Sequence, residues 1–324
     1  MPGSIRAFAT DWHPLDGARV NRIIASDDAG DATMPATTES VRRMPSARRL
    51  YYRIFGGDPL TLLGTVLLAC LILLALLGPF LVTHDPIKTS SFVLQPPSAE
   101  YWFGTDHFGR DIFSRTISSL QLDFMVAVLG VSGAVLVGVF IGALCGYLGG
   151  LFDDIVMRAV DIIQSFPLLL LAMVLVLLLG PSVVSIIIVT VLINIPSYAR
   201  LIRGETLSKK HLEYIDAARC SGASEFRILF RHLVPNTLNP IIVQGSLNLA
   251  WAVGNIAALS FLGIGIRPPT PDLGVMVSEG AKYLSQGSWW MSVFPGLVLA
   301  LTIFSLNLVG DGLQDRLDPR RARE

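Results

Sequence analysis

Six long apolar runs constrain the fold of this chain more than any other feature of its sequence. They cover residues 60–82, 124–148, 159–179, 182–199, 238–264 and 290–309. A helix needs about 20 apolar residues to cross about 30 Å of hydrocarbon. Only helices and closed barrels satisfy their backbone hydrogen bonds in lipid, and these runs are too long for barrel strands. We therefore predict an all-α polytopic membrane protein with six transmembrane helices.

The third run, 159–179, differs from the others in carrying a charge and a proline. Asp161 lies in its first turn, and Pro167 lies inside it. Proline removes a helical hydrogen bond and clashes with the preceding turn. We therefore predict a kink in this helix at Pro167.

The distribution of basic residues predicts the orientation, because Lys and Arg favour cytoplasmic loops. The first run is preceded by Arg42, Arg43, Arg48, Arg49 and Arg53. Lys and Arg are also frequent in residues 200–236 and after the last run, whereas acidic residues outnumber them in residues 83–123. This pattern predicts that the N-terminus and the C-terminus are both cytoplasmic.

Composition and motifs disfavour several functional classes. Hydrophobic residues make up 52% of the chain and charged residues 15%, which is too apolar for an ordinary soluble domain. The formal net charge is zero, so no basic field suggests nucleic acid. Cys70, Cys145 and Cys220 show no disulfide or metal-ligand spacing. Because the sequence also has no phosphate-binding loop, we expect no catalytic residue, bound metal or cofactor in this chain.

The loop between the fourth and fifth runs is predicted to form a helix–turn–helix. Leu212, Ile215 and Ala218 continue one helical face, and Gly222 ends that helix. Ser224 is expected to cap a second helix. Spacing alone leaves two alternatives, which are a compact knob that docks on a soluble partner and a solvated connector with incidental helix.

The stretch 216–222 of this loop reads Asp-Ala-Ala-Arg-Cys-Ser-Gly. It resembles the EAA loop of the permease subunits of bacterial ATP-driven importers, whose motif is Glu-Ala-Ala, three residues and Gly. Asp216 stands for the Glu, Ala217 and Ala218 match, and Gly222 has the spacing of the motif.

Three further segments resemble the C-type subunits of the dipeptide, oligopeptide and nickel permease family. They are residues 97–111 before the second run, 153–167 at the entry to the third, and 261–269 at the end of the fifth. The chain departs from the family pattern in Asp216 and in the sequence 272–274, Asp-Leu-Gly, where many members have a Trp-Gly pair. The motifs occur in the family's order, and together they cover roughly residues 50–320.

This resemblance implies the type I ABC importer permease fold, in the bacterial cytoplasmic membrane, and a division of the chain. Residues 1–45 would be a disordered cytoplasmic tail, in keeping with their polar composition, and 46–123 the first transmembrane helix with an external loop. Residues 124–312 would be the permease core, with a cytoplasmic coupling loop at 200–236, and 313–324 a cytoplasmic tail.

The resemblance also implies the partners of the chain. They are a homologous second permease subunit, two ATPase subunits that bind ATP and Mg²⁺, and an extracytoplasmic substrate-binding protein. In the family, the EAA loop couples nucleotide-driven closure of the ATPases to the membrane helices. By resemblance this role falls to Asp216, Ala217, Ala218, Arg219 and Gly222.

Polar side chains inside the apolar runs are candidates for the translocation path. Gln244, Asn248 and Asn255 share one face of the fifth helix, and Asn194 and Asn307 are weaker candidates in other runs. Polar residues in a membrane helix face the bundle interior. The alternative is interhelical hydrogen bonding, with each contact contributing about 0.6 kcal/mol.

An acidic and basic cluster before the second run has a different expected role. It comprises Asp106, His107, Arg110 and Asp111. Because no Cys and no other His except His84 lies nearby, we expect Arg–Asp pairs that hold an external loop over the outer mouth, and not a metal or catalytic site.

These observations predict a permease subunit of an ATP-driven importer of dipeptides or oligopeptides that forms half of the translocation path. The same transporter class carrying nickel, glutathione or another small solute stays open as an alternative. The alternatives of a different class are a proton-coupled secondary carrier and an orphan membrane scaffold. The carrier is disfavoured, because it needs a mid-membrane acid and an internal repeat, and the sequence shows neither.

Overall fold

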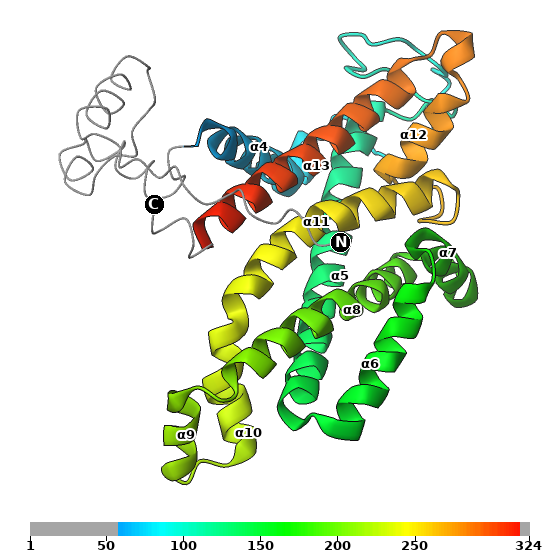
Figure 1. The fold of residues 1–324 in the computed structure, drawn as a ribbon. Coiled ribbons are helices and arrows are strands. Elements are labelled where there is room, and N and C mark those ends of the chain that lie inside the picture. Colours follow the sequence, from blue (N-terminus) through cyan, green and yellow to red (C-terminus); the bar gives the residue numbers. More distant parts are fainter. Residues whose placement is uncertain (1–57, 318–324) are drawn as a thin grey trace, which may run out of the picture. The chain divides into compact units, whose positions relative to one another are not determined.

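The computed structural model of this chain describes residues 58–317. Within this range the regular structure is helical, apart from one isolated bridge between Thr105 and Asp111. The long helices are α4 (Pro59–Leu81), α5 (Ile112–Leu148), α6 (Gly150–Ser165), α7 (Leu168–Leu179), α8 (Val183–Lys209), α11 (Leu238–Phe261) and α13 (Trp290–Leu317) (Figure 1). The short elements are α9 (Glu213–Cys220), α10 (Glu225–Arg227), the π-helical turn η1 (Ile228–Leu233), the 3₁₀ turn η2 (Val234–Thr237), α12 (Leu273–Ala281) and the 3₁₀ turn η3 (Leu284–Gln286).

Side-chain caps define where several of these helices begin. The Asp58 carboxylate accepts hydrogen bonds from the backbone N–H groups of Leu60 and Thr61, and Pro59 occupies the first helical position of α4. The Thr61 hydroxyl also donates to this carboxylate, and that bond lowers the pKa of Asp58. Asp111 caps α5 in the same way by accepting from the Ser114 N–H at 2.9 Å.

Five helices, α4, α5, α8, α11 and α13, are long and apolar enough to cross a membrane. The sixth predicted span is broken, because α6 and α7 meet at an angle of 95°. The break lies at Phe166 and Pro167, where Phe166 has the extended conformation that a following proline favours. The predicted kink at Pro167 is therefore a sharp bend between two helices (Figure 1).

Some predictions fall outside the described residues. The tail predicted over 1–45 and the five arginines before the first run lie there, as do residues 318–324. Other helices extend beyond their apolar runs. α5 begins at Ile112 and α8 continues to Lys209, because polar caps and ion pairs stabilise turns that an apolar pattern does not mark.

α5 and α8 form the most extensive helix pair of the fold. Glycines on α5 face α8 at nearly every turn of the contact, namely Gly130, Gly133, Gly138, Gly142 and Gly146. A Cβ atom at Gly138 would lie 2.6 Å from the Cβ of Tyr198. Small residues let membrane helices approach closely, so that van der Waals packing can stabilise the pair where lipid provides no hydrophobic driving force.

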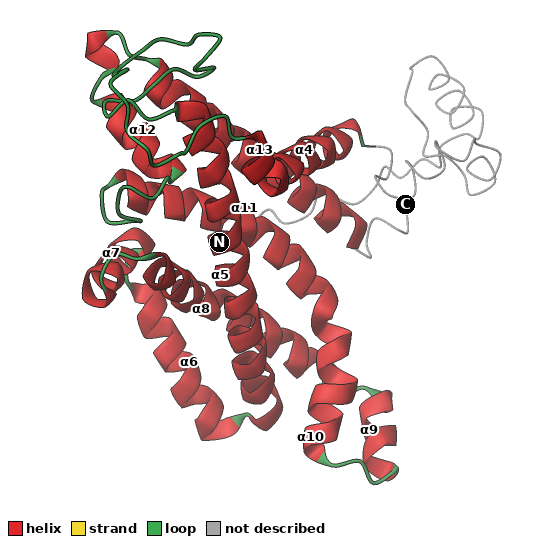
Figure 2. Cartoon of the chain, turned by 180° about the vertical axis from the view of Figure 1, so that it is seen from behind, coloured by secondary structure: helices red, strands yellow, loops and turns green. Residues whose placement is uncertain are grey.

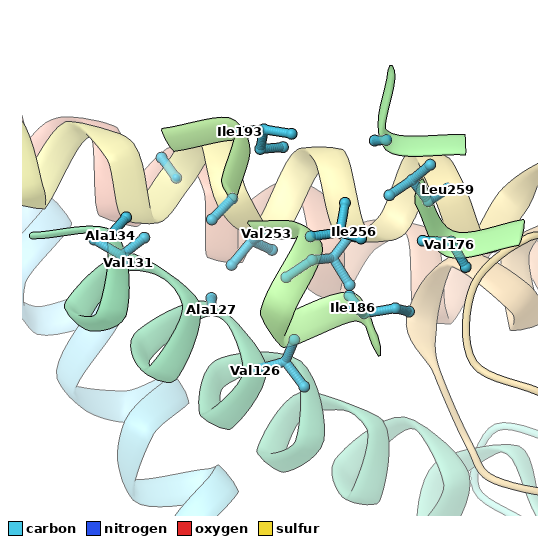
Figure 3. Packing of buried hydrophobic residues seen from close by; sticks show 14 of the residues in the cluster. Val126, Ala127, Val131, Ala134, Val176, Ile186, Ile193, Val253, Ile256 and Leu259 are labelled. Atoms are coloured by element: carbon cyan, nitrogen blue, oxygen red, sulfur yellow. The ribbon is translucent and has the colours of Figure 1, made fainter. Parts of the chain in front are cut away.

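One buried cluster joins five of the helices, and α13 contributes Leu306 to it. In Figure 3, α5 contributes Val126, Ala127, Val131 and Ala134, α7 contributes Val176, α8 contributes Ile186 and Ile193, and α11 contributes Val253, Ile256 and Leu259. Seen from behind in Figure 2, α9 and α10 project at one end of the bundle, and α12 lies at the opposite end. We refer to these ends as the α9 end and the α12 end.

Candidate functional site

The predicted coupling motif lies on a small projection at the α9 end. We call residues 213–227, which comprise α9, its turn and α10, the α9 knob. Ile215 is fully buried and packs with Ile202, Ile228 and Leu233, which anchors α9 to the bundle. Asp216, Ala217, Arg219 and Gly222 are exposed, and Ala218 is half-buried. The motif therefore presents most of its residues outward on an anchored base.

Gly222 forms the turn of the α9 knob. Its φ of +76° is in the left-handed region, which glycine adopts without the steric cost of a side chain. Its N–H donates to the Arg219 carbonyl at 2.9 Å, and the Ala223 N–H donates to the Ala218 carbonyl at 3.1 Å. A Cβ atom at Gly222 would meet no atom within 4 Å. The turn thus needs glycine for its backbone conformation, and the space outside it is open.

The second helix of the predicted helix–turn–helix is short. α10 has three residues and continues into the π-helical turn η1. Ser224 occupies the N-cap position, but its side chain makes no capping hydrogen bond. The predicted N-cap position at Ser224 is therefore right, but the predicted capping by its side chain is wrong.

A polar network joins the α9 knob to the end of α5. The Tyr147 hydroxyl donates to the Glu225 carboxylate, and Arg219 donates from one terminal nitrogen to the Tyr147 oxygen at 3.5 Å. Arg219 also donates to Asp216 at 3.2 Å and lies 3.8 Å from Glu225. The bond to Tyr147 raises the pKa of Arg219. Sequence spacing gave no sign of Tyr147, because it lies 72 residues before Arg219.

The polar candidates on α11 do not all have the same surroundings. Asn248 is buried, and its side-chain oxygen accepts from the Gln244 side chain at 3.0 Å. Gln244 is half-buried and lines a cavity of about 590 Å³ near the α9 end. Glu205 and Lys209 of α8 also line this cavity, and their charged groups are 2.7 Å apart.

A second cavity, of about 430 Å³, lies beside the middle of α11. Its lining brings together Asn255 of α11 and Asn307 of α13 with Trp251 and Ile303. The Asn307 amide also donates to the Ile303 carbonyl of its own helix at 3.0 Å. Trp251 was not predicted, although a spacing of seven from Gln244 and four from Asn255 puts it on the same helical face.

Asn194 has a different environment from the cavity residues. It is half-buried on α8, and its side-chain amide donates to the Thr190 carbonyl one turn earlier at 2.8 Å. It lines neither of the two cavities that hold the other candidates. Its hydrogen bond within α8 is typical of a polar side chain that satisfies itself on its own helix.

At the α12 end, buried ion pairs hold the loop between α4 and α5. Arg110 donates to Asp106 at 2.6 Å and to Glu279 of α12 at 3.4 Å. Asp106, His107 and Glu279 offer ligand atoms within 4.8 Å of one another. Because the Arg110 guanidinium already neutralises both carboxylates, this arrangement fits an ion-paired clasp better than a cation site.

Asp272 caps α12 at the same end. Its carboxylate accepts from the Val275 N–H at 2.9 Å and from the Ser260 hydroxyl at 3.0 Å. Burial raises the pKa of Asp272. The neighbouring Gly274 packs against the backbone of Ala257, where a Cβ atom would overlap the carbonyl oxygen. Residues 272–274, which depart from the family pattern, thus provide the N-cap of α12 and a close contact with α11.

Sequence comparison assigns this arrangement to a family. Residues 138–323 match the family described as the binding-protein-dependent transport system inner membrane component. The chain belongs to this family. Residues 46–97 also match the N-terminal transmembrane domain of oligopeptide transport permease C. This protein is therefore a multi-pass inner-membrane permease of the ABC importer class, as its motifs predicted.

Individual relatives are similar to this permease over most of its length. It is 40% identical to the dipeptide transport system permease protein DppC of Alkalihalophilus pseudofirmus, over 81% of this chain and 86% of that protein. It is also 40% identical to the probable D,D-dipeptide transport system permease protein DdpC of Escherichia coli, over 82% and 89%. The glutathione transport system permease protein GsiD of Pectobacterium atrosepticum is 34% identical, over 89% and 96%.

Proposed function

We propose that this permease imports dipeptides or oligopeptides and that the α9 knob couples it to ATPase subunits. The exposure of Asp216, Ala217, Arg219 and Gly222 on a buried base carries this proposal, because a protruding surface with open space outside Gly222 suits a partner's groove. The peptide cargo is supported by relatives whose names specify dipeptides.

The complete transporter would contain a second, homologous permease, two ATPase subunits and an extracytoplasmic binding protein. ATP and Mg²⁺ would be bound by the ATPase subunits and not by this chain. Motion of the α9 knob would reach the membrane helices through Ile215 and through the Tyr147–Glu225 hydrogen bond, which ties the knob to α5. Rocking of the two permeases would then open the path alternately to each side.

Three of the polar candidates fit this path. Asn255 and Asn307 line the middle cavity, and Gln244 lines the cavity near the α9 end. Asn248 bonds Gln244 from a buried position, and Asn194 bonds its own helix, so packing roles suit these two better. Glutathione is a second candidate cargo, because GsiD resembles this chain over nearly its whole length.

Reconstitution of the complete transporter in proteoliposomes tests the proposal. Wild type should import radiolabelled alanyl-alanine when ATP, Mg²⁺ and the binding protein are present. Gly222→Trp should abolish both import and co-purification of the ATPases, because a bulky side chain would enter the partner's groove. Import of glutathione without import of alanyl-alanine would reassign the cargo.

Gly287→Trp provides a matched control for backbone strain. Gly287 is also exposed and has a φ of +85°, and a Cβ atom there would meet no atom within 4 Å, but it lies at the α12 end. This variant should keep its ATPases. The coupling role of the knob is refuted if Gly222→Trp co-purifies with the ATPases and imports as well as Gly287→Trp does.

A further inference from the structure

Trp251 is the largest side chain of α11 and lies on the same helical face as Gln244 and Asn255. It is 68% exposed and lines the middle cavity with Asn255 and Asn307. Leu247, one helical turn earlier, lines the cavity near the α9 end. Trp251 therefore lies one helical turn from a residue that lines the cavity near the α9 end.

The two cavities differ in charge. The cavity near the α9 end holds the Glu205–Lys209 ion pair together with Asn236, Asn239 and Gln314. The middle cavity is lined by Ala250, Trp251, Gly254, Asn255, Ile303 and Asn307, none of them charged. A substrate moving along α11 would therefore leave a neutral, partly aromatic site before it meets the charged pair.

The side-chain amides that line the middle cavity favour a polar occupant. Within residues 58–317 the Asn255 side chain makes no hydrogen bond. An amide offers two donors and one acceptor group, which match the backbone of a peptide. Lipid would leave the Asn255 carboxamide without a hydrogen-bond partner, which is unfavourable for a polar group inside a membrane. Tryptophan in membrane helices is enriched at the water interfaces, so an exposed indole near the centre of α11 is also unusual for a lipid contact.

We propose that Trp251, Asn255 and Asn307 form an uncharged subsite that binds the substrate peptide through its backbone during translocation. The carboxamides would hydrogen-bond the peptide groups, and the indole face would pack on them and on apolar side chains. Because the subsite lacks charge, it would accept peptides of differing side-chain charge. This inference rests on the proposed import of peptides.

Site-directed photocrosslinking tests which molecule occupies the subsite. The probe is radiolabelled alanyl-alanine, and benzoylphenylalanine replaces Trp251 in the reconstituted transporter. During ATP turnover, illumination should attach the label to this subunit. The same replacement at Phe304, which is 50% exposed on α13 and lines neither cavity, should not acquire label. Crosslinks from position 251 only to the second permease, or only to lipid, would overturn the proposal.

Uptake by substituted transporters provides an independent measurement. Trp251→Ala should lower the maximal rate of alanyl-alanine import about tenfold, whereas Trp251→Phe should stay within about twofold of wild type, because phenylalanine keeps an aromatic face. Assembly and ATP hydrolysis should be unchanged, so more ATP is hydrolysed per peptide imported. Phe304→Ala is the matched control and should import normally.

The outcomes separate this inference from the proposed function. If wild type imports no alanyl-alanine, then the proposed dipeptide cargo itself is wrong. If wild type imports it while Trp251→Ala imports at the wild-type rate, only the subsite is wrong.

Discussion

Arg203 of α8 donates two parallel hydrogen bonds to the carboxylate of Asp153 on α6, each 2.6 Å long. The Asp153 side chain is buried, and that of Arg203 is about one-third exposed. A two-pronged bond between a guanidinium and a carboxylate fixes distance and orientation together. This bond therefore fixes the position of α6 relative to α8, the helix that precedes the α9 knob.

We expect Arg203 and Asp153 to stabilise the fold cooperatively. A double-mutant cycle with Arg203→Gln and Asp153→Asn should give a coupling energy of about 1–2 kcal/mol, because the bond is charged and partly shielded from water. Denaturant unfolding in detergent measures it. Arg200 and Asp161 make a matched control on the same two helices, also 2.6 Å apart but much more exposed. Their coupling should be below about 0.5 kcal/mol, and equal values for the two pairs would contradict this prediction.

The contact between α5 and α8 should not tolerate a methyl group at Gly142. A Cβ atom there would overlap the backbone carbonyl of Ala199, which cannot rotate away. Gly142→Ala should destabilise the protein by about 1–3 kcal/mol. Gly204→Ala, at an exposed position of α8 with no atom within 4 Å, should instead stabilise it by about 0.5–1 kcal/mol, because alanine is the better helix former. Loss of stability in both variants would show that helix packing is not the cause.

Removing the Tyr147 hydroxyl should loosen the α9 knob from α5. Tyr147→Phe loses the hydrogen bonds to Glu225 and Arg219, so ATP hydrolysis should continue while import per ATP falls severalfold. Tyr214→Phe is the control, because Tyr214 lies on the same knob and makes no hydrogen bond within the described chain. Equal import per ATP in wild type and both variants would refute a coupling role for this bond.

Asp272 should make the stability of the permease depend on pH. Burial raises the pKa of Asp272, so the folded state holds its proton more tightly than the unfolded state does. The resulting stability is fully present below the unfolded pKa of about 3.9 and is lost as the pH rises through the higher folded pKa. Tm should therefore fall as the pH rises over this window.

Asp272→Asn removes this titrating carboxyl, which lies beside the buried carboxyl of Asp123. The asparagine keeps an acceptor for the Val275 N–H but carries no charge, so its Tm should depend less on pH than that of wild type. Glu100→Gln neutralises an exposed carboxyl in the loop between α4 and α5 and should follow the wild-type curve. If wild type and Asp272→Asn give parallel curves, then the proton on Asp272 is not linked to folding.

The sequence by itself predicted the helical membrane class and most of the spans. Length and apolarity are properties of one segment, so α4, α8 and α13 begin within one residue of their apolar runs. The turn in residues 216–222 could also be predicted from the segment alone, because glycine favours the left-handed conformation that Gly222 adopts after α9. The position of the bend at Pro167 was predicted, but its angle of 95° was not. Both α6 and α7 pack on α8, and the angle between them depends on that tertiary packing.

Tertiary structure decided which side chains meet. Asn255 and Asn307 share a cavity, whereas Asn248, on the face predicted for all three α11 residues, is buried against its neighbours. The Tyr147–Arg219 contact and the Arg203–Asp153 bond likewise join distant segments. Helical periodicity fixes only the relative directions of side chains on one helix. The rotation of each helix against its neighbours is set by close packing, such as the glycine contacts of α5 with α8, and no single segment encodes it.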